Sequence, residues 1–113
     1  MRRATLAVNG VPVGWPVACC DSFWWRLRGQ LAARRRHGLI WMLSPCSAVH
    51  SFFLAQPIDV AFCDADGLIV RVFVPMQAWR LAAARGAASA WEFPAGSLDR
   101  LALGRGDRLS LCA

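Results

Sequence analysis

The segment IDVAFCDADGLIVRVFV, residues 58–74, decides the fold of this chain. Two apolar runs, 58–63 and 68–74, flank the acidic turn 64–67. Both runs are rich in β-branched and aromatic residues, which favour strands, and Asp and Gly favour a tight turn. Symmetric pairing about this turn would set Ala61 opposite Val70. Both faces of this hairpin are mostly apolar, so we expect it to be covered on both sides.

The flanking sequence predicts further strands around this central hairpin. Strands are expected at residues 5–8, 11–18, 39–43, 49–54, 90–93 and 108–112. Asn9-Gly10 is a strong signal for a two-residue hairpin turn between the first two. A helix is expected near residues 21–35 and a short one near 97–103, capped by Asp21 and Ser97. The sequence thus predicts a β-rich α+β domain, a small, partly closed barrel of about seven strands.

Length and composition indicate one globular domain. A chain of 113 residues can bury a single core, and 57% hydrophobic residues with 18% charged residues exclude a disordered protein. No apolar run approaches the roughly 18 residues that a membrane span needs. Because no continuous apolar segment follows Met1-Arg2-Arg3, we expect a cytoplasmic protein without a transmembrane segment.

The positive charge is confined to the N-terminal third. Residues 1–36 hold seven Arg against Asp21 alone, which gives +6, while the remaining six Arg balance six acidic residues. Such a basic region could bind nucleic acid or an anionic lipid surface. A solvated helix face above core aromatics explains it more simply, so this function is kept as an alternative.

The five Cys do not form a spaced framework, and we expect them to be thiols used mainly as small apolar side chains. Cys46 and His50 have a Cys-x3-His spacing, but no third Cys or His lies close by in sequence. The sequence therefore predicts no metal and no cofactor.

Two polar residues of the 45–59 region are the candidate site residues that carry the most chemistry. His50 could act as a general base or contact a ligand, because imidazole titrates near neutral pH, or it could only hydrogen-bond a loop. Asp59 lies between Ile58 and Val60, so we expect it to be buried and paired. It could tie down the loop at 75–88 through Arg80, or form the floor of a polar pocket.

Several separated motifs occur in an order typical of one bacterial and archaeal family. They are Arg26-Leu27-Arg28-Gly29, Pro45-Cys46, Val49-His50, Phe52-Phe53, Pro57-Ile58-Asp59, Trp79-Arg80, Glu92-Phe93-Pro94-Ala95-Gly96 and Gly106-Asp107. Over residues 5–112 the chain therefore resembles the domain of unknown function 192 family. The resemblance implies a fold but no established reaction. Leu54-Ala55-Gln56 stands where relatives usually have a basic residue, so a basic ligand contact is not expected here.

These observations predict a shallow pocket walled by Cys46, His50, Asp59, Trp79 and Arg80. The leading functional hypothesis is a non-enzymatic binding or accessory module for a small polar ligand or a peptide. The alternative is a small hydrolase-like enzyme, with Cys46 as nucleophile, His50 as base and Asp59 as the orienting acid. Such an enzyme also needs an oxyanion hole, which the sequence does not reveal.

Overall fold

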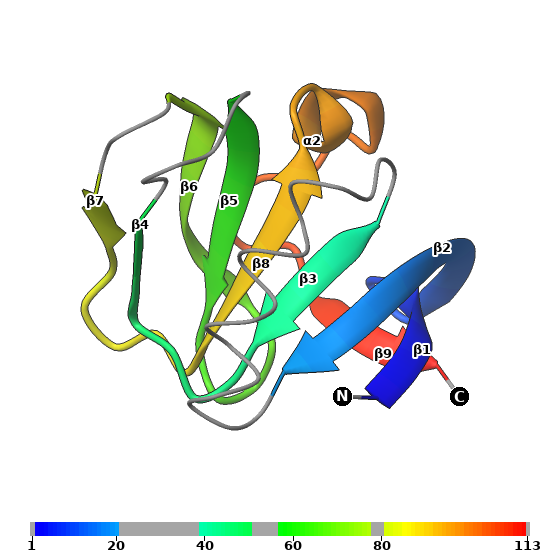
Figure 1. Ribbon diagram of the computed structural model, residues 1–113. Coiled ribbons are helices and arrows are strands. Elements are labelled where there is room, and N and C mark those ends of the chain that lie inside the picture. The colour runs from blue at the N-terminus through cyan, green and yellow to red at the C-terminus, as the bar shows by residue number, and fades with distance from the viewer. Residues whose placement is uncertain (1, 21–38, 51–56, 78–80, 113) are drawn as a thin grey trace.

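The computed structural model describes residues 2–20, 39–50, 57–77 and 81–112 (Figure 1). These residues form nine strands and one short helix. The elements are β1 (Arg2–Val8), β2 (Val11–Cys20), β3 (Ile40–Leu43), β4 (Ala48–His50), β5 (Ile58–Cys63), β6 (Ile69–Met76), β7 (Leu81–Ala83), β8 (Ser89–Pro94), α2 (Ser97–Arg100) and β9 (Leu109–Cys112).

Seven of the strands form one sheet in the order β6-β5-β8-β3-β2-β1-β9, and β4 pairs with β7 in a second, small sheet. All neighbours in the large sheet are antiparallel except β2 and β3, which are parallel. Parallel neighbours need a crossover connection, and residues 21–38 link these two strands in sequence. The helix predicted at 21–35 falls in this connection, outside the described residues.

Among the described residues, the two edges of the large sheet meet at one corner. An isolated bridge joins Leu68 to Arg108. Beside it, Ile69 N donates to Asp107 O at 2.8 Å, and Leu109 N donates to Gly67 O at 2.9 Å. The prediction of a β-rich α+β domain is therefore confirmed, but the barrel description is only partly right, because the sheet does not close along β6 and β9.

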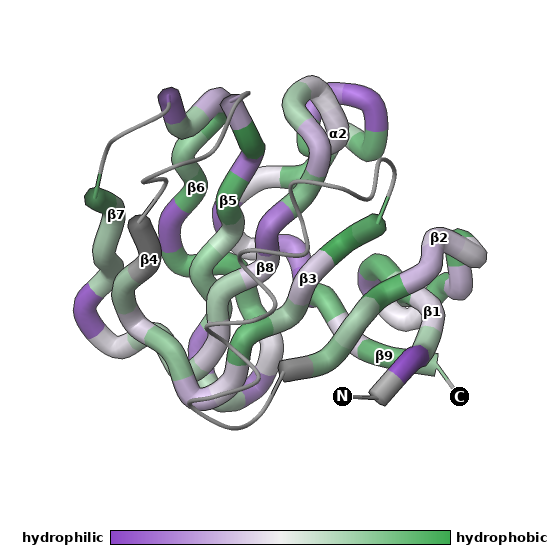
Figure 2. Tube along the Cα trace, viewed as in Figure 1, coloured by the Kyte–Doolittle hydropathy of each residue, from purple (hydrophilic) through white to green (hydrophobic). Residues whose placement is uncertain are grey.

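The central strands are buried on both faces, as the sequence predicted. Side chains that alternate along β3, β5 and β8 enter two separate clusters, which we call core 1 and core 2. Core 1 includes Leu6, Val17, Ile40, Met42, Ala61, Cys63, Trp91, Phe93 and Leu98. Core 2 includes Trp41, Leu43, Val60, Phe62, Met76, Ala82, Ala84 and Ala90. In Figure 2, β5 is hydrophobic along its length except for a hydrophilic position near its start.

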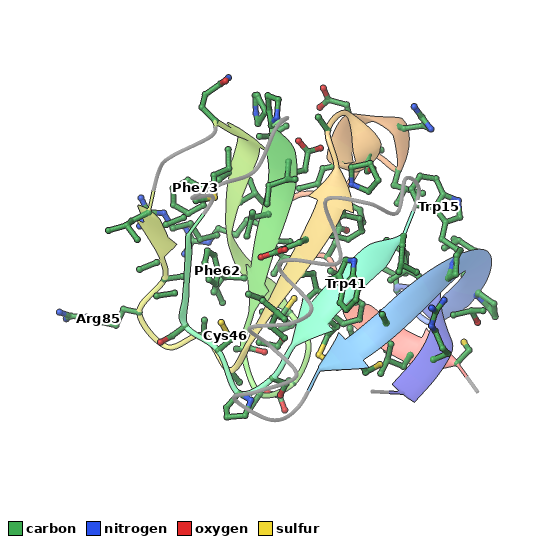
Figure 3. The ribbon with its side chains drawn as sticks, in the orientation of Figure 1. Trp15, Trp41, Cys46, Phe62, Phe73 and Arg85 are labelled. Atoms are coloured by element: carbon green, nitrogen blue, oxygen red, sulfur yellow. The ribbon has the colours of Figure 1, made fainter. Side chains whose placement is uncertain are left out.

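The small sheet packs on the core 2 side of the large one. Ala82 of β7 belongs to core 2. Arg71 of β6 donates from Nη1 to Ala83 O at 3.0 Å, and its guanidinium lies 4.6 Å from the centre of the Phe73 ring. Phe73 in turn meets Phe62 edge-on, with 6.0 Å between the ring centres (Figure 3). The region 75–88 is therefore more regular than expected, since β6 extends into it and β7 lies within it.

The central hairpin has the predicted turn but a shifted register. Asp64 Oδ1 accepts hydrogen bonds from Asp66 N and Leu68 N, which explains the acidic turn. Ala61 pairs with Val72, not with Val70, because the pairing is irregular next to the turn, between Phe62 and Cys63. The shift is by two residues, which preserves the face to which the side chains at this position point.

Gly67 provides a test of the corner that joins the two edges. Its φ is +85°, and a Cβ there would lie 2.6 Å from Leu109 O, whereas Gly86, at φ +81°, has open space. Both substitutions to Ala should lose roughly 1–2 kcal/mol for the left-handed backbone. We expect Gly67→Ala to lose roughly 1–3 kcal/mol more than Gly86→Ala in urea unfolding, because of the steric overlap. Equal losses would contradict the close contact.

Candidate functional site

Asp59 lies at the start of β5, opposite Phe93 of β8, and is fully buried. Its Oδ2 accepts hydrogen bonds from Gly96 N at 3.1 Å and from Leu98 N at 3.0 Å. These amides belong to the turn after β8 and to the first turn of α2. Asp59 therefore fixes the start of α2 against core 1, which Leu98 enters.

Burial raises the pKa of the Asp59 carboxyl above its ordinary value, and the hydrogen bonds from Leu98 and Gly96 offset this only in part. The second oxygen, Oδ1, is buried and has no hydrogen-bond partner among the described residues. Asp59 is thus a buried and paired carboxyl, as predicted. Its described partners are backbone amides, while Arg80 lies outside the described residues.

Cys46 lies in the loop between β3 and β4 and is half-buried against core 2 (Figure 3). Its backbone N donates to Ala88 O at 3.1 Å, and Ala84 N donates to Ser47 O at 3.0 Å, so the loop is tied to residues 84–88. The Cys46 thiol donates to Ala48 O at 3.1 Å. Beside it is an open hollow of about 370 Å³, lined by Pro45, Cys46, Ser47, Ala48 and Ala87.

His50 ends β4, two residues beyond the rim of this hollow, and its backbone pairs with Leu81 of β7. Trp79 and Arg80 directly precede Leu81 in sequence. These two residues and the His50 side chain lie outside what the structure describes. Their contribution to a pocket therefore stays a prediction.

The structure does not bring Asp59 together with Cys46. Cys46 packs on core 2 and bonds Ala88, just before β8, whereas Asp59 points to the core 1 side opposite Phe93. Ala88 and Phe93 are five residues apart along the chain, which corresponds to about 16 Å in a strand. In the hydrolase-like alternative, Asp59 would orient His50, but its Oδ2 is occupied by Gly96 and Leu98 on the other face of the sheet.

Glu92 is a buried carboxyl whose importance the sequence analysis missed. It is the second acidic residue of the central strands and is only 5% exposed. It pairs with Trp41 on one side and Val60 on the other, so it points to the core 2 side. Its Oε2 is buried without a hydrogen-bond partner among the described residues, and burial raises its pKa to about 7. The sequence did contain an indication of this burial, because Glu92 stands between Trp91 and Phe93 in a predicted strand of a sheet that is expected to be covered on both faces.

The comparisons with known proteins agree with this architecture. Residues 5–111 match the DUF192 family, described as "Uncharacterized ACR, COG1430". The chain belongs to the DUF192 family. No curated protein matches it significantly.

Two crystal structures share the DUF192 chain's fold. A proposed transcription regulator from Sinorhizobium meliloti 1021 superposes with a TM-score of 0.83 at 20% identity, covering 97% of this chain and 94% of its own. A protein of unknown function from Novosphingobium aromaticivorans DSM 12444 gives 0.78 at 14% identity, covering 94% and 83%. At these identities the similarity establishes the fold alone.

The described residues also bear on the wider predictions for this DUF192 chain. None of their helices is long and apolar enough to cross a membrane. Within the same residues, no three His, Cys, Asp or Glu side chains lie close enough to hold a metal ion. Cys19, Cys46, Cys63 and Cys112 are thiols and not disulfides. Of the seven N-terminal Arg, Arg2 and Arg3 lie on β1, and the others fall outside the described residues.

The structural role of Asp59 predicts a graded response to substitution. Asp59→Ala leaves Gly96 N and Leu98 N without their acceptor, and a buried unpaired donor such as Leu98 N costs about 1–3 kcal/mol. Asp59→Asn keeps an oxygen for both amides and should lose clearly less. Urea unfolding of the three proteins checks this order. Wild-type stability in Asp59→Ala would contradict the role.

Glu92 should make stability depend on pH. Its pKa is 4.5 ordinarily and about 7 in the folded chain, so between these values the folded chain keeps a proton that the unfolded chain releases. Stability should therefore fall as pH rises from about 4.5 to 7, by on the order of 3 kcal/mol, and then level off. Glu92→Gln cannot ionise and should lose most of this decline.

Urea unfolding at pH 5 and pH 8 measures the difference. Asp66→Asn, at an exposed position of the turn 64–67, is the matched control and should keep the wild-type decline. The residual slope in Glu92→Gln should come from Asp59, whose raised pKa acts in the same direction. An undiminished decline in Glu92→Gln would show that Glu92 does not cause it.

Proposed function

We propose that this chain is a non-enzymatic binding or accessory module, which takes a small polar ligand or a short peptide beside β4. The observation that carries this proposal is the open hollow of about 370 Å³ next to Cys46. This volume falls at the lower end of the range of ligand pockets, roughly 300–1,000 Å³. A shallow site of this kind suits reversible contact with a ligand that stays largely in solvent.

The hollow is held rigidly by backbone contacts. Two hydrogen bonds, Cys46 N to Ala88 O and Ala84 N to Ser47 O, join its two walls. The walls therefore belong to segments that are far apart in sequence but fixed to the large sheet. Binding sites are commonly formed by loops that a rigid scaffold holds in place.

The chemistry of the site comes from the residues that adjoin the hollow. Cys46 offers a thiol at its wall, and β4 leads from Ala48 at its rim to His50. The β4–β7 pairing sets His50 opposite Leu81, which follows Trp79 and Arg80 in sequence. In this proposal Cys46, His50, Trp79 and Arg80 contact the ligand, and Asp59 supports the scaffold from the other face.

A thermal-shift screen with small polar compounds and capped tripeptides tests the proposal. Hits are titrated against wild type, Cys46→Ala and His50→Ala. We expect both variants to bind at least about tenfold more weakly, which corresponds to the loss of one or two polar contacts. Cys112→Ala is the matched control, because Cys112 is a partly buried thiol on β9, and it should bind as wild type does.

Two results would contradict the proposal. Unchanged affinity in both Cys46→Ala and His50→Ala would place the ligand elsewhere. Chemical conversion of a hit by wild type, followed by mass spectrometry, would favour the hydrolase-like alternative.

A further inference from the structure

Asn9, the first residue of the turn between β1 and β2, is held against the segment before β9 by three hydrogen bonds. Its backbone N donates to Arg108 O at 2.9 Å, and its side-chain Oδ1 accepts from Arg108 N at 2.8 Å. Its Nδ2 donates to Asp107 Oδ1 at 3.0 Å. Both polar atoms of the carboxamide are therefore bonded, although Asn9 is exposed to solvent.

The segment that Asn9 contacts also forms the corner where the two edges of the large sheet meet. On the side away from Asn9, Ile69 N donates to Asp107 O. Next to it, Leu109 N donates to Gly67 O. Residues 107–109 thus join β6 to the turn between β1 and β2. A change at Asn9 therefore acts directly on this corner.

Asn9 is followed by Gly10, and this pair is chemically reactive. The backbone N of Gly10 can attack Asn9 Cγ, which closes a five-membered succinimide ring, while the side-chain nitrogen takes up the Gly10 proton and leaves as ammonia. Water then opens the ring at either carbonyl and gives aspartate or isoaspartate. Glycine obstructs the attack least because it has no side chain, and nothing lies within 4 Å of where a Gly10 Cβ would be.

In the closed corner the carboxamide cannot make this reaction. It faces Asp107 and Arg108, and turning Cγ onto the Gly10 nitrogen breaks both side-chain hydrogen bonds. Ring closure therefore requires the corner to open first. The rate of the reaction then depends on how often the corner opens, because local openings have their own free energies within a folded protein.

The products do not fit the closed corner. Aspartate at position 9 keeps an acceptor for Arg108 N but sets a carboxylate oxygen against Asp107 Oδ1, where Nδ2 now donates. Hydrogen bonds from Asn9 and from Gly104 N lower the pKa of Asp107, so its carboxylate is ionised at neutral pH and repels a second one. The φ of 51° at position 9 is tolerated by Asp as well as by Asn, so the conflict is one of charge. Isoaspartate adds a methylene to the main chain and so disrupts the two-residue turn.

We propose that Asn9 is a site of spontaneous deamidation that Asp107 protects, and that its modification permanently loosens the corner between the two edges of the sheet. The chain thereby keeps a chemical record of corner opening. This site does not depend on the function proposed for the Cys46 hollow.

The first test measures deamidation of Asn9 by peptide mass spectrometry at one pH and temperature. Native wild type should deamidate at least about tenfold more slowly than the same chain in guanidinium chloride, the protection that about 1.4 kcal/mol of closing free energy gives. Asp107→Ala removes one bond from the carboxamide and should speed the native reaction about fivefold. Asp66→Ala, which removes an exposed carboxylate from the turn 64–67, is the matched control and should react as wild type does.

The second test measures the effect of the product by amide hydrogen exchange. Asn9→Asp should speed exchange at Ile69 N and Leu109 N, the two corner amides, at least about fivefold, which corresponds to the loss of one hydrogen bond. Leu98 N, which is bonded to Asp59, is the internal control and should change little.

The double variant Asn9→Asp/Asp107→Asn separates charge from the loss of a particular side chain. The new amide at position 107 can donate to the new carboxylate at position 9 and still accept from Gly104 N. The donor and acceptor are thus exchanged, and exchange at the corner amides should return most of the way to the wild-type rate.

Two results would overturn the protected site. One is equal deamidation in native and unfolded wild type, which needs no variant to fold, and the other is a wild-type rate in Asp107→Ala. The proposed loosening would be overturned by unchanged corner exchange in Asn9→Asp, by an equal rise at Leu98 N, or by a double variant no slower than Asn9→Asp.

Discussion

The pairing of β8 with β5 on one side and β3 on the other is the constraint on which the rest of the structure depends. These strands lie inside the sheet and are covered on both faces, so their buried apolar side chains enter core 1 or core 2. Such strands cannot expose a polar side chain to solvent by turning it outward. Each polar residue in them must therefore find a partner inside the molecule or a ligand.

Asp59 and Glu92 meet this constraint in different ways. Asp59 lies near the end of β8, where Gly96 and Leu98 present backbone amides to it. Glu92 is one residue further inside β8, on the opposite face, where its neighbours in register are Trp41 and Val60. Burial raises both pKa values, but only Asp59 gains hydrogen bonds that oppose the rise. Asp59 is thus tied to the scaffold by hydrogen bonds, while Glu92 Oε2 has no hydrogen-bond partner among the described residues.

The proposed ligand site and the buried Glu92 lie on the same side of the sheet. Cys46 packs against core 2, and Glu92 points to the same side as Trp41 of that core. The core 1 side, by contrast, is organised by α2 and by Asp59. The fold therefore divides the chain into one face that mainly stabilises it and one face that carries the candidate chemistry.

Local sequence was enough to predict most strands. Alternation and β-branched residues located β5 at residues 58–63, and Asn9-Gly10 located the first hairpin, whose two turn residues have φ values of 51° and 82°. The register predicted for the central hairpin, β5 with β6, was wrong. The pairing is irregular next to the turn, and this irregularity depends on contacts that simple pairing rules do not contain. The extent of β6 was also underestimated, since β5 pairs with it as far as Met76.

The sequence by itself determined that the fold is β-rich, that its central strands are buried on both sides, and that Asp59 is a buried, paired carboxyl. These properties follow from composition and from a period of two residues, which are local. Only the tertiary structure decided which face each polar residue occupies and what lies opposite it. Asp59 and Cys46 are close in sequence but separated by the sheet, while Trp41 and Glu92 are distant in sequence and adjacent in space. Strand order and register set these distances, and both arise from long-range pairing.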